Sequence, residues 1–467
     1  MIFASSKTTH NSLRMEQITV LLASVSHLLP GANINQFGLI IQSIYTISSG
    51  GVTQKNISRY GDLSYRSVSR FMSCGFVWRR LLISLLSTHF TSADDNFLIA
   101  IDETVEDKAG KSTSKLGYFY CSKAKKAIKS VSFSVASLIS VKERKSYVVD
   151  FEQLEQDKEK SAANKAKKQA AKAKKESGDT EKKASGRPKG STNKIKKKSD
   201  SVGSVALETI LNRILPLLCT IGIVPRYLVG DGAYGNMTGC LIAAACNLQL
   251  ISKLHCNTAL FFAPHKGTKQ RKYGEQVDFA KLDTYKIGEE ELDDFTVTYF
   301  QIKKARMKHI DKFINVVIVR CLNLKTKKYS YVLLFSTDLE LDGMTLLDYY
   351  ALRFQIEFNF RDSKQYFGLS DFRSIQPVQV TNAVGLSFFM VNLSQILIAQ
   401  TKAALGVDFL SIQDLKAYFR AIFYAQRLKN TPDLAIPNIL DPKVAHFVAN
   451  LGGVNWDNLT YSVNKVA

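Results

Sequence analysis

The chain has 467 residues, 45% of them hydrophobic and 22% charged, which is enough for two or three globular domains with a large core. It has no apolar run of the roughly 18 residues that a membrane-spanning helix needs, and its first residues lack the features of a signal peptide. The net charge of +22 favours a polyanionic partner, of which nucleic acid is the commonest.

The N-terminal part predicts helices. Through most of residues 1–92 apolar residues recur at helical spacing, and Ser64 can cap a helix that begins at Tyr65. This helix would expose Arg66 and Arg70, as the recognition helix of a helix-turn-helix exposes its DNA contacts. A small helical domain whose polar face is only solvated explains the same pattern. Both interpretations stay open, and the two arginines are candidate DNA contacts.

A sheet is predicted next. An apolar run at residues 97–101 leads into Asp102. Two runs rich in β-branched and aromatic residues, 116–120 and 131–140, follow at hairpin-like spacing. This pattern is typical of three antiparallel strands, so residues 93–156 are assigned to the first part of an α/β core.

The composition changes sharply after this sheet. Residues 158–198 contain sixteen Lys or Arg and four acids, and we predict a flexible basic segment over residues 157–202 because so few apolar side chains cannot form a core. A Gly-Arg-Pro-Lys-Gly-Ser motif at 186–191 resembles an AT-hook, in which Arg187 and Lys189 would enter a narrow minor groove. A solvated basic linker is the alternative, and either one places positive charge near phosphate.

The α/β pattern resumes after the basic segment. A strand at residues 226–230 leads into Asp231, and residues 203–250 are assigned to the second part of the core. Residues 251–340 are predicted to be a β-rich insertion. Its clearest strands are 295–302, 313–322 and 329–336.

The last part of the chain is predicted to be helical. Apolar spacing indicates one long helix over residues 345–366, within a segment, 341–375, that would belong to the core. Residues 376–467 are assigned to a helical C-terminal region.

Asp102 and Asp231 each follow an apolar strand. Carboxylates that meet at the ends of neighbouring strands can hold two divalent ions about 4 Å apart, which promote phosphoryl transfer in DNA, and Mg²⁺ prefers such oxygen ligands. Each aspartate taken singly is equally explained as an ordinary strand end or turn.

The helix predicted at 345–366 adds a third carboxylate. At about 100° per residue, Tyr350, Arg353, Glu357 and Lys364 fall within an arc of about 60°. One face therefore presents a carboxylate that can bind metal beside cations that can bind phosphate. A surface helix with ion pairs between successive turns is the alternative, although Arg353 before Glu357 is the less favourable order for such a pair.

The spacing Tyr350-x2-Arg353-x3-Glu357-x6-Lys364 resembles the Tyr-Arg-Glu-Lys signature of insertion-sequence DDE transposases, a bacterial group sometimes called family four. Four specified residues match by chance about once in 10⁵ positions. Two further segments resemble the acidic motifs of the family: Asp102-Glu103-Thr104 and Gly230-Asp231-Gly232-Ala233-Tyr234.

The resemblance implies an RNase H-like fold, which is a mixed five-stranded sheet flanked by helices, with a β-rich subdomain inserted before the glutamate. It implies that the three acids, Asp102, Asp231 and Glu357, are catalytic and hold two Mg²⁺ ions, for which Mn²⁺ can substitute. The implied contacts to the phosphates of the transposon end are Tyr350, Arg353 and Lys364.

The implied activity is cut-and-paste DNA transposition. A homodimer in a synaptic complex would cleave DNA at the terminal inverted repeats and join the ends to target DNA, in the cytoplasm of a bacterium and without a membrane. The alternatives are an RNase H-like nuclease without strand transfer and an inactive transposase that only binds DNA. The sequence leaves open the terminal repeat, the target preference, a hairpin intermediate and the role of the basic segment.

Overall fold

The computed structural model describes residues 18, 20–29, 33–48, 50–90, 95–156, 201–264, 272–405 and 408–429. The basic segment predicted over residues 157–202, with Arg187 and Lys189, lies outside the described residues except for its last two positions.

The N-terminal part is helical, as predicted. Its helices are α2 (Asn33–Thr46), α3 (Gln54–Tyr60), α4 (Tyr65–Met72) and α5 (Trp78–Ser87). The predicted cap of α4 is confirmed, because the Ser64 hydroxyl oxygen accepts a hydrogen bond from the Ser67 N–H at 3.1 Å. Val68 and Phe71 on α4 are buried, whereas Arg66 and Arg70 are exposed.

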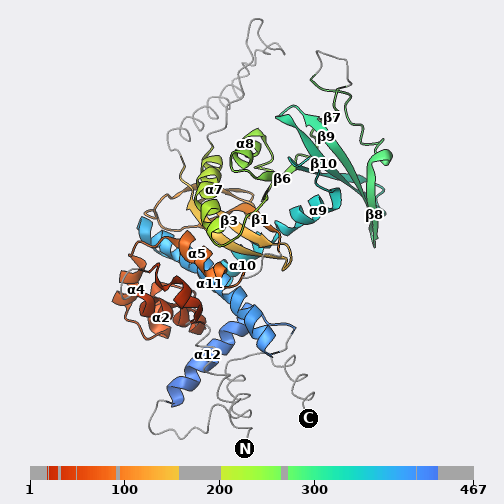
Figure 1. Ribbon diagram of the computed structural model, residues 1–467. Coiled ribbons are helices and arrows are strands. Elements are labelled where there is room, and N and C mark those ends of the chain that lie inside the picture. Colours follow the sequence, from red (N-terminus) through yellow and green to blue (C-terminus); the bar gives the residue numbers. More distant parts are fainter. Residues whose placement is uncertain are drawn as a thin grey trace, which may run out of the picture.

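The centre of the molecule is a mixed sheet (Figure 1). Its core strands are β1 (Phe97–Asp107), β3 (Lys126–Ser140), β4 (Lys145–Gln153), β5 (Tyr227–Gly230) and β6 (Gln249–Leu254). They lie in the order β4-β3-β1-β5-β6, in which β1 is antiparallel to β3 and parallel to β5, and β5 is parallel to β6. This mixed α/β arrangement is consistent with the RNase H-like fold that the resemblance implies.

Two details of the first part of the sheet differ from the prediction. The strand that carries Asp102 does not end there, because β1 continues to Asp107 in register with β3. A fourth strand, β4, pairs with β3 beyond the predicted three. The short strand β2 (Gly117–Cys121) pairs with the start of β3.

The β-rich region continues the same sheet. Its strands are β7 (Leu260–Phe261), β8 (Lys286–Leu292), β9 (Phe295–Met307), β10 (Ile310–Asn323) and β11 (Tyr329–Ser336), with a 3-10 turn, η1 (Asp283–Tyr285). Strand β11 pairs with β6 of the core on one side and with β10 on the other. In Figure 1 these strands extend to one side of the core, opposite the N-terminal helices.

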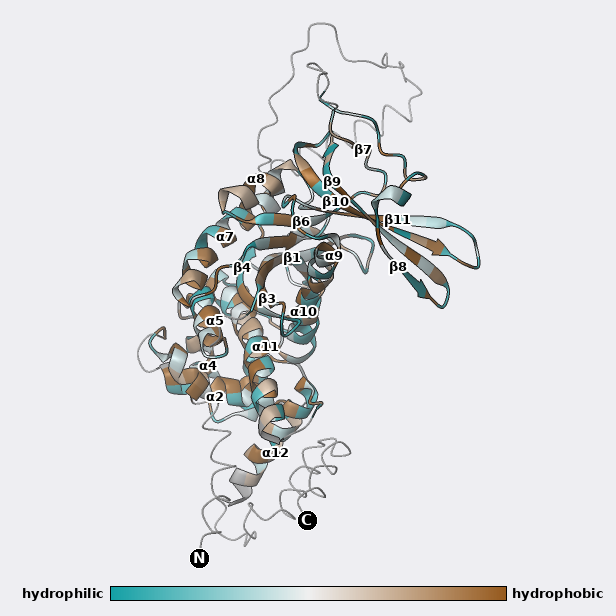
Figure 2. Cartoon of the chain, turned by 45° about the vertical axis from the view of Figure 1, so that its right-hand side comes forward, coloured by the Kyte–Doolittle hydropathy of each residue, from teal (hydrophilic) through white to brown (hydrophobic). Residues whose placement is uncertain are grey.

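Helices cover the core sheet. They are α7 (Val202–Thr220), α8 (Met237–Ala245), α9 (Gly343–Leu352), α10 (Gln355–Tyr366), α11 (Pro377–Leu405) and α12 (Ile412–Lys429). Helix α7 contacts β3 and β4, and α10 contacts β1 and β4. Apolar residues gather where these helices meet the sheet and one another (Figure 2).

The single helix predicted over residues 345–366 is wrong. The structure has two helices, α9 and α10, with a break at Arg353 and Phe354. The break is tight, since the Ile356 N–H bonds to the Arg353 carbonyl and the Glu357 N–H to the Phe354 carbonyl. The break does not separate Tyr350, Arg353 and Glu357, since the Arg353 guanidinium lies 3.4 Å from a Glu357 oxygen and 5.7 Å from the Tyr350 ring.

Helix α11 joins the N-terminal helices to the core. Asn382 on α11 accepts a hydrogen bond from the Trp78 indole N–H at 2.8 Å and donates to the carbonyls of Met72 and Cys74. By length and composition α7 and α11 are each apolar enough to cross a membrane, but 83% of the apolar window of α11 is buried inside the protein. Burial of this kind is typical of a core helix, and α7 is one of the helices that cover the sheet.

Candidate active site

The two aspartates lie side by side at the same edge of the sheet. Strands β1 and β5 are parallel, and their register pairs Ile101 with Gly230, so the next residues, Asp102 and Asp231, fall on adjacent positions. Neighbouring strands are about 4.8 Å apart. As predicted, Asp102 and Asp231, which are distant in the sequence, lie next to each other in the structure.

Backbone donors hold both aspartates. One oxygen of Asp102 accepts the Glu103 N–H at 2.8 Å, and one oxygen of Asp231 accepts the Ala233 N–H at 2.9 Å. The Asp231 carbonyl accepts the Ser252 hydroxyl at 2.6 Å, which ties the turn after β5 to β6.

Helix α10 brings Glu357 to this edge. Ile356 is fully buried, and Asn359 is fully buried with its amide donating to the Ser146 hydroxyl at 2.6 Å. The side-chain oxygen Oδ1 of Asn359 accepts a hydrogen bond from the side-chain amide of Gln395 on α11 at 2.9 Å. These contacts fix α10 between the sheet and α11, with Glu357 only partly buried at the rim.

Arg353 connects two of the three acids. Its guanidinium lies 2.7 Å from a carboxylate oxygen of Asp102 and 3.4 Å from one of Glu357. The arginine side chain is only 14% exposed, and the ring of Tyr350 lies 5.7 Å from its guanidinium carbon. Arg353, at the break between α9 and α10, thus places a cation between Asp102 and Glu357.

The carboxylates interact electrostatically. Burial raises the pKa of Asp102, and the charges of Asp231 and Glu357 raise it further, against the lowering effects of the Glu103 N–H and Arg353. Partial desolvation and then the charges of Asp102 and Asp231 raise the pKa of Glu103. The neighbouring carboxylates thus oppose one another's ionisation, and a multivalent cation among them would relieve this repulsion.

The donor set fits a hard divalent cation. Asp102, Asp231 and Glu357 offer only carboxylate oxygens, with no thiol or imidazole in the group, and these are the ligands that Mg²⁺ prefers. Within the described residues no three acidic, His or Cys side chains already stand close enough together to hold an ion. The residues thus suit the ion by their chemistry, while Arg353 occupies the space between two of them.

Lys364 has a different environment from the one expected of a phosphate contact. Its ammonium lies 2.8 Å from Glu106, whose side chain is only 4% exposed, and 3.3 Å from the Val105 carbonyl. Ser370 donates to the other Glu106 oxygen at 2.7 Å. Sequence reasoning missed Glu106, and alternation along β1 was the available signal, because it puts Thr104 and Glu106 on the buried face.

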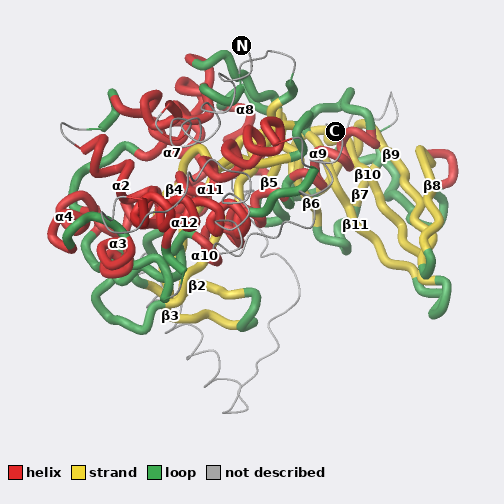
Figure 3. Tube along the Cα trace, turned by 90° about the horizontal axis from the view of Figure 1, so that it is seen from below, coloured by secondary structure: helices red, strands yellow, loops and turns green. Residues whose placement is uncertain are grey.

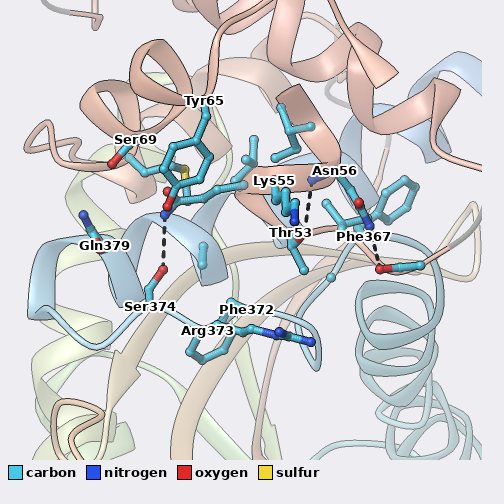
Figure 4. Close-up of a pocket in the computed structure, with 18 of the residues that line it drawn as sticks. Thr53, Lys55, Asn56, Tyr65, Ser69, Phe367, Phe372, Arg373, Ser374 and Gln379 are labelled. Carbon is cyan, nitrogen blue, oxygen red and sulfur yellow. Dashed lines mark hydrogen bonds between the residues drawn. The ribbon is translucent and has the colours of Figure 1, made fainter. Parts of the chain in front are cut away.

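The two N-terminal arginines are not brought to the three acids. Arg66 and Arg70 lie on α4, which packs mainly against α2, α3 and α11. Between α3, α4 and the segment after α10 lies a cavity of about 440 Å³ (Figure 4). Figure 4 shows Tyr65 on the side of the N-terminal helices and Arg373 on the opposite wall. None of the three acids is among the residues that line this cavity.

A family profile described as DDE superfamily endonuclease matches residues 47–307, which is more than half of the chain. The chain belongs to this family. The match includes Asp102 and Asp231 and ends before Glu357. Membership implies a DNA substrate and a nuclease or transposase type of enzyme, and endonucleases of this superfamily generally use divalent metals. No curated protein matches the chain.

Proposed function

We propose that the chain is the transposase of an insertion sequence, of the Tyr-Arg-Glu-Lys group, that cuts DNA at the ends of its element and joins them to target DNA. The convergence of Asp102, Asp231 and Glu357 at one edge of the sheet carries this proposal. The family match supports an endonuclease, and the spacing of the motif around Glu357 supports strand transfer in addition.

In the proposed reaction an oxygen of water, and later the 3′-hydroxyl of the cut end, attacks phosphorus and displaces the oxygen on the opposite side. The three acids would hold two Mg²⁺ ions, with Mn²⁺ as a substitute. The bound ions supply the positive charge that aligns the attacking oxygen and stabilises the leaving one. Arg353 would leave Asp102 and Glu357 and turn to the DNA phosphate, where its guanidinium can bind two oxygens.

The remaining parts of the chain receive proposed roles by the same reasoning. Residues 1–92 would contact DNA through Arg66 and Arg70, and the β-rich region 251–340 would be an insertion into the core. Tyr350 and Lys364 would approach the terminal phosphates, and Lys364 would have to exchange its contact with Glu106 to do so. The protein would act as a homodimer on the inverted repeats in the bacterial cytoplasm.

The test is cleavage of a DNA duplex that carries the element's own end, with Mg²⁺, Mn²⁺ or EDTA. Glu357→Gln should abolish cleavage while DNA binding is retained, because the amide cannot replace the carboxylate as a metal ligand. Glu340→Gln is the matched control, since Glu340 is 80% exposed and pairs at 3.7 Å only with Lys303 among the described residues.

The other functions give different results in the same experiment. Cleavage by the wild type without joining of the 3′ ends to a supercoiled target would identify a nuclease. If the wild type binds the DNA but does not cleave it with Mg²⁺ or with Mn²⁺, the protein is a DNA-binding protein with the fold of a transposase, and the proposal is refuted.

A further inference from the structure

A two-stranded ribbon extends past the candidate active site. Residues 117–121 of β2 pair with residues 126–130 of β3, joined by a turn at 122–125. Among the described strands, residues 126–128 of β3 pair with β2 and not with β1. In Figure 3 the ribbon stands at the lower edge of the molecule, away from the helices.

The ribbon and the residues that precede it are rich in lysine, of which Lys115, before the ribbon, pairs with Glu155 at 3.9 Å. Residues 108–129 contain seven lysines and neither aspartate nor glutamate. The turn contributes Lys123 and Lys125, and Lys126 follows at the start of β3, all three exposed. Such a surface is complementary to a polyanion.

Exposed aromatic rings share one face of the ribbon with part of this charge. Tyr118 and Tyr120 are each 65% exposed. Tyr118 is directly opposite Lys129, and Tyr120 is opposite Ala127, and residues opposite each other in an antiparallel pair project from the same face. Tyrosines beside lysines are suited to bases and sugars flanked by phosphates, so this face offers both kinds of contact to nucleic acid.

The direction of β1 relates the ribbon to the three acids. From Asp102 the strand runs five residues to Asp107, which pairs with Ser130 at the base of the ribbon. At about 3.3 Å per residue this is about 17 Å, or about five base pairs of B-DNA. DNA that ran along β1 from a phosphate at Asp102 would therefore reach the ribbon within about one helical turn.

The Lys-rich part of the chain begins at the same place. The Gln156 side chain accepts the Tyr118 N–H at 3.1 Å, at the outer edge of β2. The residues that follow, 158–198, contain sixteen Lys or Arg. The described chain therefore ends beside the ribbon at Gln156, just before the part of the sequence with the largest concentration of charge.

We propose that the β2–β3 ribbon binds the DNA duplex next to the reacting phosphate, with its lysines on the phosphates and Tyr118 and Tyr120 in a groove. The major groove of B-DNA admits a two-stranded ribbon of this kind. This inference rests on the proposed function for the identity of the DNA, but binding to the ribbon requires neither metal nor cleavage.

The test measures binding of the full chain to a fluorescein-labelled duplex of about 40 base pairs in EDTA across a range of salt concentrations. In one variant Lys123, Lys125 and Lys126 are replaced by Gln. If all three contact phosphate, the slope of log K against log salt should fall by about 2 to 3, with affinity about 10- to 100-fold weaker at physiological salt. A thermal melt checks that each variant is folded.

A matched control removes the same charge from another hairpin. In the β10–β11 turn Lys325, Lys327 and Lys328 are exposed, and their replacement by Gln should change affinity less than about threefold. An unchanged slope in the ribbon variant, or an equal loss in the control, overturns the proposal.

The tyrosines are tested separately. The variant with Tyr118→Ala and Tyr120→Ala should bind the duplex about 5- to 30-fold more weakly with its salt slope unchanged, because rings contribute contacts that release no counterions. Tyr329→Ala, at an exposed tyrosine of β11, is the control. Wild-type affinity in the double tyrosine variant overturns the proposal for the groove. Because these measurements use no metal, failure of cleavage by the wild type would leave their result intact.

Discussion

Lys364→Met separates a structural role of Lys364 from the phosphate contact that the resemblance implies. The change keeps much of the side chain's length and removes its charge. Glu106, 4% exposed, would lose the ammonium at 2.8 Å and keep the Ser370 hydroxyl at 2.7 Å. A buried carboxylate would then lose the cation that pairs with it, although the charge of Lys108 still acts on Glu106.

The magnitude follows from the geometry. Two unit charges 2.8 Å apart attract by about 6 kcal/mol at an effective dielectric constant of about 20, and the desolvation of both charges offsets part of this. Removal of one partner of a buried pair costs about 3–5 kcal/mol. Because Lys364 is itself 31% exposed, water replaces some of its contribution, and we expect about 3 kcal/mol. For the 350 residues that the structure describes, this lowers Tm by about 4 °C.

The assay is a double-mutant cycle on thermal and urea unfolding with Lys364→Met, Glu106→Gln and the double variant. A coupling of about 2–3 kcal/mol is expected between the two residues. DNA binding is measured on the same proteins. The structural role would be refuted if the effects of the two substitutions were additive, the stability of Lys364→Met lay within about 0.5 kcal/mol of wild type, and its DNA binding were weakened.

Three further predictions concern other contacts. Arg353→Gln should bind Mn²⁺ about 5- to 10-fold more tightly by calorimetry, because the guanidinium 2.7 Å from Asp102 no longer competes with the ion; unchanged or weaker binding would contradict this. Asn382→Leu should cost about 3 kcal/mol in urea unfolding, since the buried Trp78 N–H and two carbonyls lose their partner. Burial lowers the pKa of Lys416 from 10.5 to about 8, so Lys416→Met should be more stable than wild type by about 1–2 kcal/mol at pH 7. The stability of the wild type relative to this variant should rise between pH 8 and pH 10.5, because in this range only the unfolded chain still holds the proton on Lys416. If the difference in stability between the two proteins does not narrow over this range, the charge of Lys416 is not its cause.

The sequence predicted the elements whose formation is local. Runs of β-branched and aromatic residues gave the strand before Asp231 and the cores of β9, β10 and β11, because a pleated, buried surface selects such side chains. The Ser64 cap of α4 was predictable for a similar reason, since a serine at that position satisfies a nearby backbone N–H.

The elements that were missed depend on distant partners. No Gly or Pro marks the break at Arg353 and Phe354, and the Arg353 guanidinium pairs with Asp102, which is 251 residues away in the chain. The pairing of β6 with β11, which makes the β-rich region part of the core sheet, likewise has no signal in either strand.

By itself the sequence predicted which side chains are candidates for the chemistry, because an aspartate after each of two apolar runs and a glutamate in a spaced motif are local features of the chain. Only the tertiary structure decided how they are held. The parallel register of β1 and β5 sets Asp102 beside Asp231, Arg353 joins Asp102 to Glu357, and Lys364 is turned to a buried glutamate. These contacts join residues that are distant in the sequence through electrostatics and packing, and neither helical periodicity nor residue spacing carries information about them.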